Sequence, residues 1–147
     1  MTEEQVTITI INWLKKYNWK ILSYDFPQSG TGHIFKPNDD DNSRIIPDIV
    51  AIKNNICIFM ENKNRFVLSD FIKQNNIKTT SIYDKSINQY LKDYNINKIY
   101  FGIGLPSKTF CDKHKQYINL VDFIIGINEQ ALITNLYGFD VIDADLI

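Results

Sequence analysis

Residues 46–65, which read IPDIVAIKNNICIFMENKNR, contain two apolar segments with a short polar segment between them. The apolar segments are residues 49–52 and 56–60, and Asn54 and Asn55 stand in the gap. Two β-rich segments joined in this way predict a β-hairpin with an Asn-rich turn. Because both segments are almost continuously apolar, we expect central strands that are buried on both faces of a sheet.

Charged residues stand at the ends of these two segments. Asp48 opens the first segment, and Glu61 and Lys63 close the second. On a strand, whose side chains alternate, Glu61 and Lys63 project to one face and Asn62 projects to the other. A hairpin that turns at residues 54–55 brings Asp48 back beside Glu61. The sequence therefore predicts two carboxylates and one ammonium at one end of a buried hairpin.

The rest of the chain predicts helices and strands on both sides of this hairpin. Thr2 followed by Gln5 matches a capping box, which favours a first helix over residues 3–17. We also expect strands over residues 19–26, 98–105 and 122–127 and helices over 67–77 and 81–94, the second helix capped by Ser81. Residues 28–44 are expected to form a loop, residues 107–117 are polar and basic, and a short amphipathic tail closes the chain. This order, αβββα(α)β, predicts an α/β fold with a central mixed sheet flanked by helices.

Composition is typical of an ordinary globular protein. The chain has 147 residues, of which 44% are hydrophobic and 22% are charged, and we expect a single domain over residues 1–147. No apolar run approaches the roughly 20 residues of a membrane span, and the first residues are acidic instead of basic. We expect a cytoplasmic protein that is not in a membrane. The two cysteines form neither a disulfide framework nor a zinc motif, and His33 and His114 are expected to be solvated.

Pro47 and Asp48, followed by Glu61, Asn62 and Lys63, resemble the PD-(D/E)XK signature of the restriction-endonuclease-like nucleases. The resemblance covers residues 3–105 in the order of the elements. A Gly-rich loop is also similar to the loop that precedes the PD strand in archaeal Holliday junction resolvases, and its residues are Ser29, Gly30, Thr31 and Gly32. The resemblance implies a restriction-endonuclease-like core and a homodimer that cuts DNA with Mg²⁺.

These residue types also suit phosphodiester hydrolysis on chemical grounds. Carboxylate oxygens of Asp48 and Glu61, with waters and the main-chain carbonyl of Asn62, suit Mg²⁺, and Mn²⁺ is the expected substitute. A bound metal acidifies a water and neutralises phosphoryl charge. We expect Lys63 to orient that water or to stabilise charge in the transition state. Glu4 is a further candidate catalytic acid, although acids in a first helical turn usually complement the helix dipole.

DNA contacts are expected from Ser29, Gly30, Thr31 and Gly32 of the loop and from Arg44 and Arg65. The nearby basic residues Lys53, Lys73 and Lys78 are further candidates for phosphate contacts. The formal net charge is only −1, whereas nucleic-acid-binding modules usually have a basic excess. Any DNA surface must therefore be local, or shared with a partner such as a separate specificity subunit.

Several functions remain open from the sequence. A restriction or defence enzyme that cuts duplex DNA competes with a structure-specific, resolvase-like enzyme that cuts branched DNA, and RNA is not excluded as the substrate. A third alternative is a non-catalytic subunit with a nuclease fold that binds DNA or protein. In that case Lys63 would form an ion pair with Asp48 or Glu61, and exposed pairs of this kind stabilise a fold only slightly.

Overall fold

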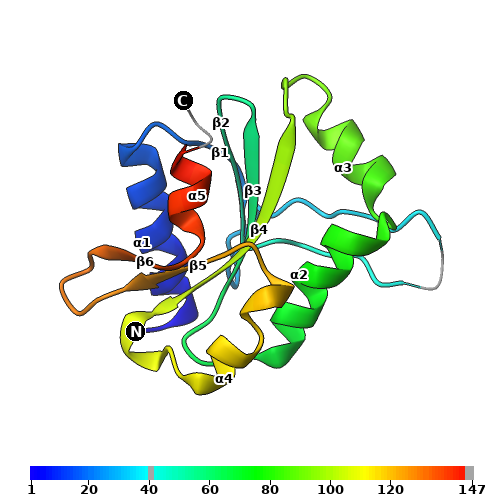
Figure 1. The fold of residues 1–147 in the computed structure, drawn as a ribbon. Helices are drawn as coiled ribbons and strands as arrows, with labels where there is room; N and C mark the ends of the chain where they lie inside the picture. The colour runs from blue at the N-terminus through cyan, green and yellow to red at the C-terminus, as the bar shows by residue number, and fades with distance from the viewer. Residues whose placement is uncertain (40–41, 145–147) are drawn as a thin grey trace.

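The computed structural model describes residues 1–39 and 42–144 and shows a central β-sheet with helices on both faces (Figure 1). The six strands are β1 (Lys20–Tyr24), β2 (Ile49–Lys53), β3 (Ile56–Asn62), β4 (Lys98–Pro106), β5 (Phe123–Ile127) and β6 (Ile133–Tyr137). The α-helices are α1 (Glu3–Lys16), α2 (Leu68–Thr80), α3 (Asp84–Leu91), α4 (Asp112–Gln116) and α5 (Phe139–Ala144). Short 3₁₀ helices cover Ser107–Thr109 and Ile118–Leu120.

The sheet is mixed, and its strands lie in the order in which they occur along the chain. β1, β2 and β3 are antiparallel, β3, β4 and β5 are parallel, and β6 returns antiparallel to β5. Parallel neighbours need a crossover connection, which α2 and α3 provide between β3 and β4. The predicted α/β class, the mixed sheet and the order of the elements up to β4 are confirmed.

The hairpin of β2 and β3 is also confirmed, and both of its strands have a neighbour on each side in the sheet. Asn54 has a positive φ of 54°, which a tight two-residue turn requires and which asparagine tolerates. Every residue of β3 is buried. Successive residues face different sides: Ile58 and Met60 pack in the core beneath α1, whereas Cys57 and Phe59 pack in the core beneath α3.

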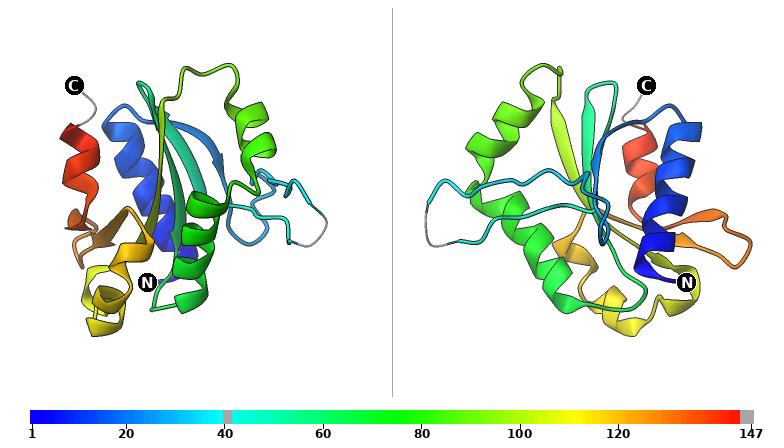
Figure 2. Two further views of the ribbon diagram at one scale, coloured as in Figure 1. Left: turned by 45° about the vertical axis from the view of Figure 1, so that its right-hand side comes forward. Right: turned by 180° about the vertical axis from the view of Figure 1, so that it is seen from behind.

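Helices α1 and α5 cover one face of the sheet, and α2 and α3 cover the other (Figures 1 and 2). The predicted capping box of α1 is present, because Thr2 and Gln5 exchange hydrogen bonds of 2.8 and 3.1 Å. The helix then buries Val6, Ile10 and Leu14 completely against the sheet. No helix within the described ranges is long and apolar enough to cross a membrane.

The structure differs from the prediction at the ends of helices and in the last quarter of the chain. Ser81 does not begin a helix: with a φ of 60° it ends α2, which runs on to Thr80. The polar segment 107–117 contains α4, and the tail contains strand β6 and helix α5, with residues 145–147 outside the described residues. β6 and α4 are short and only partly apolar, so their periodicity is weak, and they form because they pack on the rest of the fold.

His114 is a further correction, because it is not solvated. Its side chain is 1% exposed and packs among the rings of Phe66, Phe71 and Phe110. Its Nδ1 accepts a hydrogen bond of 3.0 Å from the main-chain N–H of Cys111. The first two of these aromatic residues lie more than forty positions away in the sequence, so no local pattern indicates the burial. His33 is half-buried, with its ring centroid 4.0 Å from that of Tyr90.

Candidate active site

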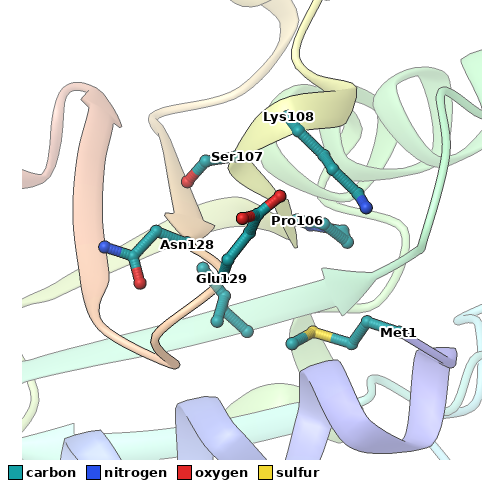
Figure 3. A pocket seen from close by; sticks show the side chains of 7 residues that line it. Met1, Pro106, Ser107, Lys108, Asn128 and Glu129 are labelled. Atoms are coloured by element: carbon teal, nitrogen blue, oxygen red, sulfur yellow. The ribbon is translucent and has the colours of Figure 1, made fainter.

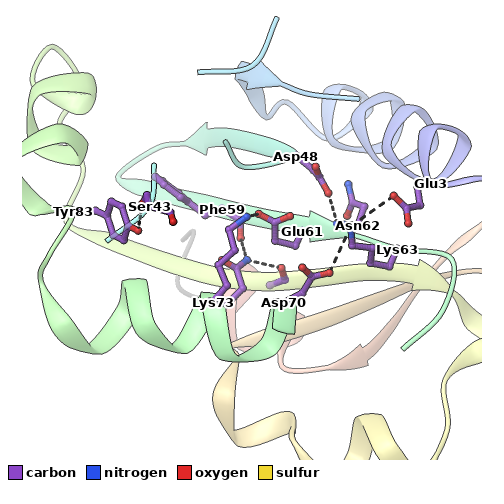
Figure 4. Close-up of polar contacts among 12 residues, drawn as sticks. Glu3, Ser43, Asp48, Phe59, Glu61, Asn62, Lys63, Asp70, Lys73 and Tyr83 are labelled. Carbon is purple, nitrogen blue, oxygen red and sulfur yellow. Dashed lines mark hydrogen bonds and ion pairs between the residues drawn. The ribbon is translucent and has the colours of Figure 1, made fainter. Parts of the chain in front are cut away.

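The end of the hairpin holds Asp48 beside the last residues of β3, as the sequence predicts. The main-chain N–H of Asp48 donates to the carbonyl of Met60 at 3.0 Å. In return, Oδ2 of Asp48 accepts a hydrogen bond of 2.7 Å from the main-chain N–H of Asn62. The Asp48 carboxylate is thereby fixed at the point where β3 ends (Figure 4).

Glu61 and Asn62 point to opposite faces of the sheet, also as predicted. Glu61 faces α2, is 4% exposed, and its Oε1 accepts a hydrogen bond of 2.6 Å from Nζ of Lys73. Asn62 faces α1, where its Nδ2 donates to Oγ1 of Thr7 at 3.1 Å. The Asn62 side chain therefore ties the first helix to the strand that carries the acid.

Lys63 lies just past the end of β3 but keeps the strand pairing, because its main-chain N–H donates to the carbonyl of Gly104 at 3.0 Å. Its ammonium lies 3.6 Å from a carboxylate oxygen of Glu3 and 3.8 Å from one of Asp70. Figure 4 shows Lys63 between these two acids. Lys63 thus belongs to the site, but its ion-pair partners come from α1 and α2 and not from the hairpin.

Helix α2 contributes three polar residues to this site. Asp70 is 9% exposed, and its Oδ2 is buried without a hydrogen-bond partner. Lys73 follows one helical turn later, on the same face, and pairs with Glu61. Gln74 is buried and donates to the carbonyls of Phe59 and Gly102 at 3.1 and 2.9 Å. Asp70 is not among the site residues predicted from the sequence. Polar residues on the side of a predicted helix that faces the sheet are the signal that indicates such a residue.

The first helix contributes Glu3 to the site. Glu3 pairs with Lys63, whereas Glu4, the residue named from the sequence, is exposed and makes no contact with these residues in the part of the chain described. Adjacent helical residues project about 100° apart, so only one of the two acids can face the sheet edge. The choice depends on how α1 is rotated on the sheet.

Burial controls the acidity of the carboxylates. Burial, together with the neighbouring Asp48 charge, raises the pKa of Glu61 to about 8 against the opposing effect of Lys73. Burial also raises the pKa of Asp48 to about 6, although the hydrogen bond from Asn62 and the charge of Lys63 oppose it. The pKa of Asp70 is raised by burial as well. The neighbouring lysines therefore do not fully offset the cost of ionising these buried carboxylates.

We call the whole set the carboxylate–lysine cluster. It contains four carboxylates and two ammonium groups, from Glu3, Asp48, Glu61, Asp70, Lys63 and Lys73. When all four carboxylates are ionised, they outnumber the ammonium groups by two, which matches the charge of a divalent cation. The donors are all oxygens, which suits a hard ion such as Mg²⁺.

Mg²⁺ does not need a full cage of protein ligands. In the described ranges, no three His, Cys, Asp or Glu side chains converge closely enough to hold an ion by themselves. Mg²⁺ usually takes one or two carboxylates and keeps several waters. Asp48 and Glu61 would supply these carboxylates. Oδ2 of Asp70, which is buried without a hydrogen bond and lies 3.8 Å from the Lys63 ammonium, would accept a hydrogen bond from a metal-bound water.

The loop residues predicted to contact DNA form hydrogen bonds within their own loop and with the segment just before it. Oγ of Ser29 accepts hydrogen bonds from the N–H groups of Phe26 and Thr31 at 3.2 and 3.5 Å. The hydroxyl of Thr31 donates to the carbonyl of Tyr24 at 2.6 Å. Gly30 is exposed with a φ of 65°. The structure does not bring these hydroxyl groups into contact with the carboxylate–lysine cluster.

Gly32 approaches the site more closely through its backbone. A Cβ at this position would collide with Asp25 and Ile46, and the N–H of Asp25 donates to the carbonyl of Asp48 at 2.9 Å. The loop therefore rests on the residues that enter β2. Only a residue without a side chain fits there.

The two arginines lie near the cluster from different sides. Arg65 is exposed, and its charge lowers the pKa of Asp70, which is raised overall by burial. Arg44 is exposed and lines a cavity together with Lys73. Of the other basic candidates, Lys78 is already paired with Asp122 at 2.7 Å.

Another cavity, of about 470 Å³, lies at the ends of β4 and β5 and is shown in Figure 3. Lys108 and Glu129 are its charged residues, and none of its lining residues belongs to the carboxylate–lysine cluster. It lacks the buried carboxylates that the chemistry requires. The candidate site is therefore the cluster at the end of the hairpin.

No protein-family model matches this chain, and no curated protein sequence matches it.

Proposed function

We propose that this chain is a Mg²⁺-dependent DNA endonuclease built on a restriction-endonuclease-like core, which acts as a homodimer. The observation that carries the proposal is the excess of carboxylate over ammonium groups in the carboxylate–lysine cluster. Burying uncompensated carboxylates costs free energy, and the raised pKa of Glu61 reports that cost. A divalent cation compensates the charge, and the same cation is what phosphodiester hydrolysis needs.

Asp48 and Glu61 would hold the ion in this mechanism. The N–H of Asn62 orients the Asp48 carboxylate, and Lys73 orients that of Glu61. When bound, Mg²⁺ lowers the pKa of a coordinated water and withdraws charge from the phosphoryl oxygens. The hairpin supplies rigid positions for both acids, because every residue of β3 is buried.

Lys63 acts as a fixed cation in this mechanism. Burial lowers the pKa of Lys63, but the carboxylates of Asp70 and Glu3 outweigh that effect and raise the pKa overall. A lysine that is held protonated cannot accept the proton of the attacking water. Its ammonium instead stabilises the negative charge that develops on the phosphate in the transition state.

A non-catalytic module with the same fold is the second candidate. The 2.6 Å ion pair between Lys73 and Glu61 favours it, because part of the buried charge is already compensated within the chain. Metal binding separates the two candidates, because a purely structural ion-pair network has no use for the ion.

Plasmid cleavage tests the proposed activity. We expect the protein to nick supercoiled DNA with Mg²⁺ or Mn²⁺ and to lose this activity in Asp48→Asn, which keeps an acceptor for the N–H of Asn62. Asp93→Asn changes an exposed acid outside the cluster and serves as the control. Full cleavage by Asp48→Asn would refute the assignment. Palindromic duplex libraries compared with four-way junctions then separate sequence-specific cleavage from structure-specific cleavage.

Metal binding should depend on pH in a defined direction. With pKa values of about 8 and about 6, Glu61 is mostly protonated at pH 7 and Asp48 is mostly ionised. Binding at neutral pH therefore releases protons from this pair of acids, and affinity rises as pH rises toward 8. Calorimetry with Mn²⁺ in two buffers of different ionisation enthalpy measures this release. Binding without proton release would place the ion elsewhere.

A further inference from the structure

A cavity of about 510 Å³ adjoins the carboxylate–lysine cluster on the side of Lys73. Lys73 belongs to both, because it lines the cavity and donates to Glu61 at 2.6 Å. In Figure 4, Lys73 stands between Glu61 and the pair formed by Ser43 and Tyr83. The cavity is therefore a direct extension of the candidate active site.

The walls of this cavity are held in place by contacts within the fold. One wall is the segment that precedes β2, and the other is formed by Lys73, Asn76 and Ile77 of α2. The hydroxyl of Tyr83 donates to the carbonyl of Ser43. Ile45 and Phe35 exchange main-chain hydrogen bonds of 3.0 and 2.8 Å. These bonds fix the position of Arg44, which lies between Ser43 and Ile45.

The lining combines two cations with two amides and an apolar floor. Arg44 and Lys73 are the charged residues, Asn42 and Asn76 supply the amides, and Ile45 and Ile77 are buried aliphatic residues. None of the lining residues that the structure describes is acidic. Asp39 lies nearby, but its carboxylate accepts hydrogen bonds of 3.2 Å from the main-chain N–H and the amide of Asn42.

This chemistry matches a nucleotide better than a bare anion. Two cations suit a phosphate, whereas an apolar floor and an amide suit the face and the edge of a base. Ligand cavities of roughly 300–1,000 Å³ hold small organic ligands, so this one is large enough for a nucleotide. A base can enter a cavity only after it leaves the helical stack, which costs least where it is unpaired.

We propose that the cavity binds one unpaired nucleotide next to the scissile phosphate, so that the substrate is DNA with an unpaired position at the cleavage point. The inference rests on the proposed nuclease function, because it uses the Glu61 site as the place of cleavage. Lys73 links the cavity to the cleavage site, since its ammonium reaches Glu61 from the wall of the cavity. Arg44 binds the phosphate of the unpaired nucleotide, and Asn76 contacts the edge of its base.

Nucleotide binding tests the cavity without any cleavage. The probes are deoxynucleoside 5′-monophosphates and inorganic phosphate, titrated calorimetrically into the metal-free protein. We expect the nucleotides to bind more tightly than phosphate, and Arg44→Ala and Asn76→Ala to weaken nucleotide binding at least about fivefold. Both residues are exposed, so folding is not at risk. Asn88→Ala and Lys92→Ala alter exposed residues outside the cavity and should bind as the parent does.

Cleavage gives a second, independent measurement. Duplexes with one unpaired nucleotide at a fixed position should be cut about tenfold faster than the matched perfect duplex, and Asn76→Ala should reduce this preference. The inference is overturned if metal-dependent cleavage shows no preference for the duplex with an unpaired nucleotide and if Arg44→Ala and Asn76→Ala bind nucleotides as the parent does. That result leaves the nuclease function in place. Nucleotide binding that depends on both residues, without cleavage of any DNA, supports the cavity and refutes the nuclease.

Discussion

Glu61→Gln is expected to abolish metal-dependent cleavage while making the metal-free protein more stable at high pH. The amide cannot replace the carboxylate as a ligand for Mg²⁺, so several kcal/mol of transition-state stabilisation are lost and cleavage falls at least about 10³-fold. The same amide is neutral, and Glu61 is buried beside Asp48. Activity and stability should therefore change in opposite directions.

The pH range of the stability effect follows from the pKa of Glu61. In the fold it is about 8, above its ordinary value of 4.5. A raised pKa means that the fold favours the protonated acid, so this contribution to stability is complete below pH 4.5 and is lost as pH rises to about 8. Glutamine does not titrate. The stability of the parent should therefore fall across this range more steeply than that of Glu61→Gln.

Thermal unfolding in EDTA at pH 5, 7 and 9 measures the difference, and plasmid cleavage measures activity. Glu129→Gln is a matched control, because Glu129 is exposed and lies outside the carboxylate–lysine cluster. This control should change neither the pH dependence of thermal stability nor the rate of plasmid cleavage. Parallel pH curves for the parent and Glu61→Gln would show that the Glu61 carboxylate is not destabilised by burial, and retained cleavage would remove it from the metal site.

Lys63→Met should reduce kcat by about 10²–10³-fold, which is the effect of removing one charge-stabilising donor from a transition state. Methionine keeps much of the length of the side chain and removes only the ammonium. The ammonium lies within 3.6 and 3.8 Å of Glu3 and Asp70, so the metal ligands themselves keep their contacts. The affinity for Mn²⁺ should therefore change far less than kcat. Single-turnover cleavage and calorimetry separate the two quantities.

Lys73→Met provides the comparison that distinguishes the two lysines. Lys73 bonds directly to Glu61, so its ammonium competes with a metal for that carboxylate. Its removal should tighten Mn²⁺ binding, whereas the removal of Lys63 should mainly slow the chemical step. If Lys63→Met cleaves at the parental rate while Lys73→Met does not, the charge-stabilising role belongs to α2 and not to the hairpin.

Much of the site follows from local patterns in the sequence. The two-residue turn at Asn54 and Asn55 sets the register of β2 on β3, and the register brings Asp48 to Asn62. Alternation along β3 then directs Glu61 and Asn62 to opposite faces. These contacts span few residues of chain, which is why periodicity and turn chemistry suffice to predict them.

The helical residues of the site could not be predicted in this way. Asp70 and Lys73 face the sheet because Phe71 and Ile77 bury their side chains and so set the rotation of α2. Which acid of α1 reaches Lys63 depends on the rotation of that helix, which the burial of Val6, Ile10 and Leu14 against the sheet sets. The apolar residues of each helix set its rotation, but the charged groups that its acids then meet lie on elements that are distant along the chain.

The sequence by itself therefore determined the hairpin, the pairing of Asp48 with the end of β3 and the direction of Glu61, because short-range geometry governs all three. Tertiary structure alone decided that Glu3 and Asp70 hold Lys63, that Lys73 holds Glu61 and that a cavity opens beside them. Those contacts join elements that are distant along the chain, and the packing of apolar side chains on both faces of the sheet selects them.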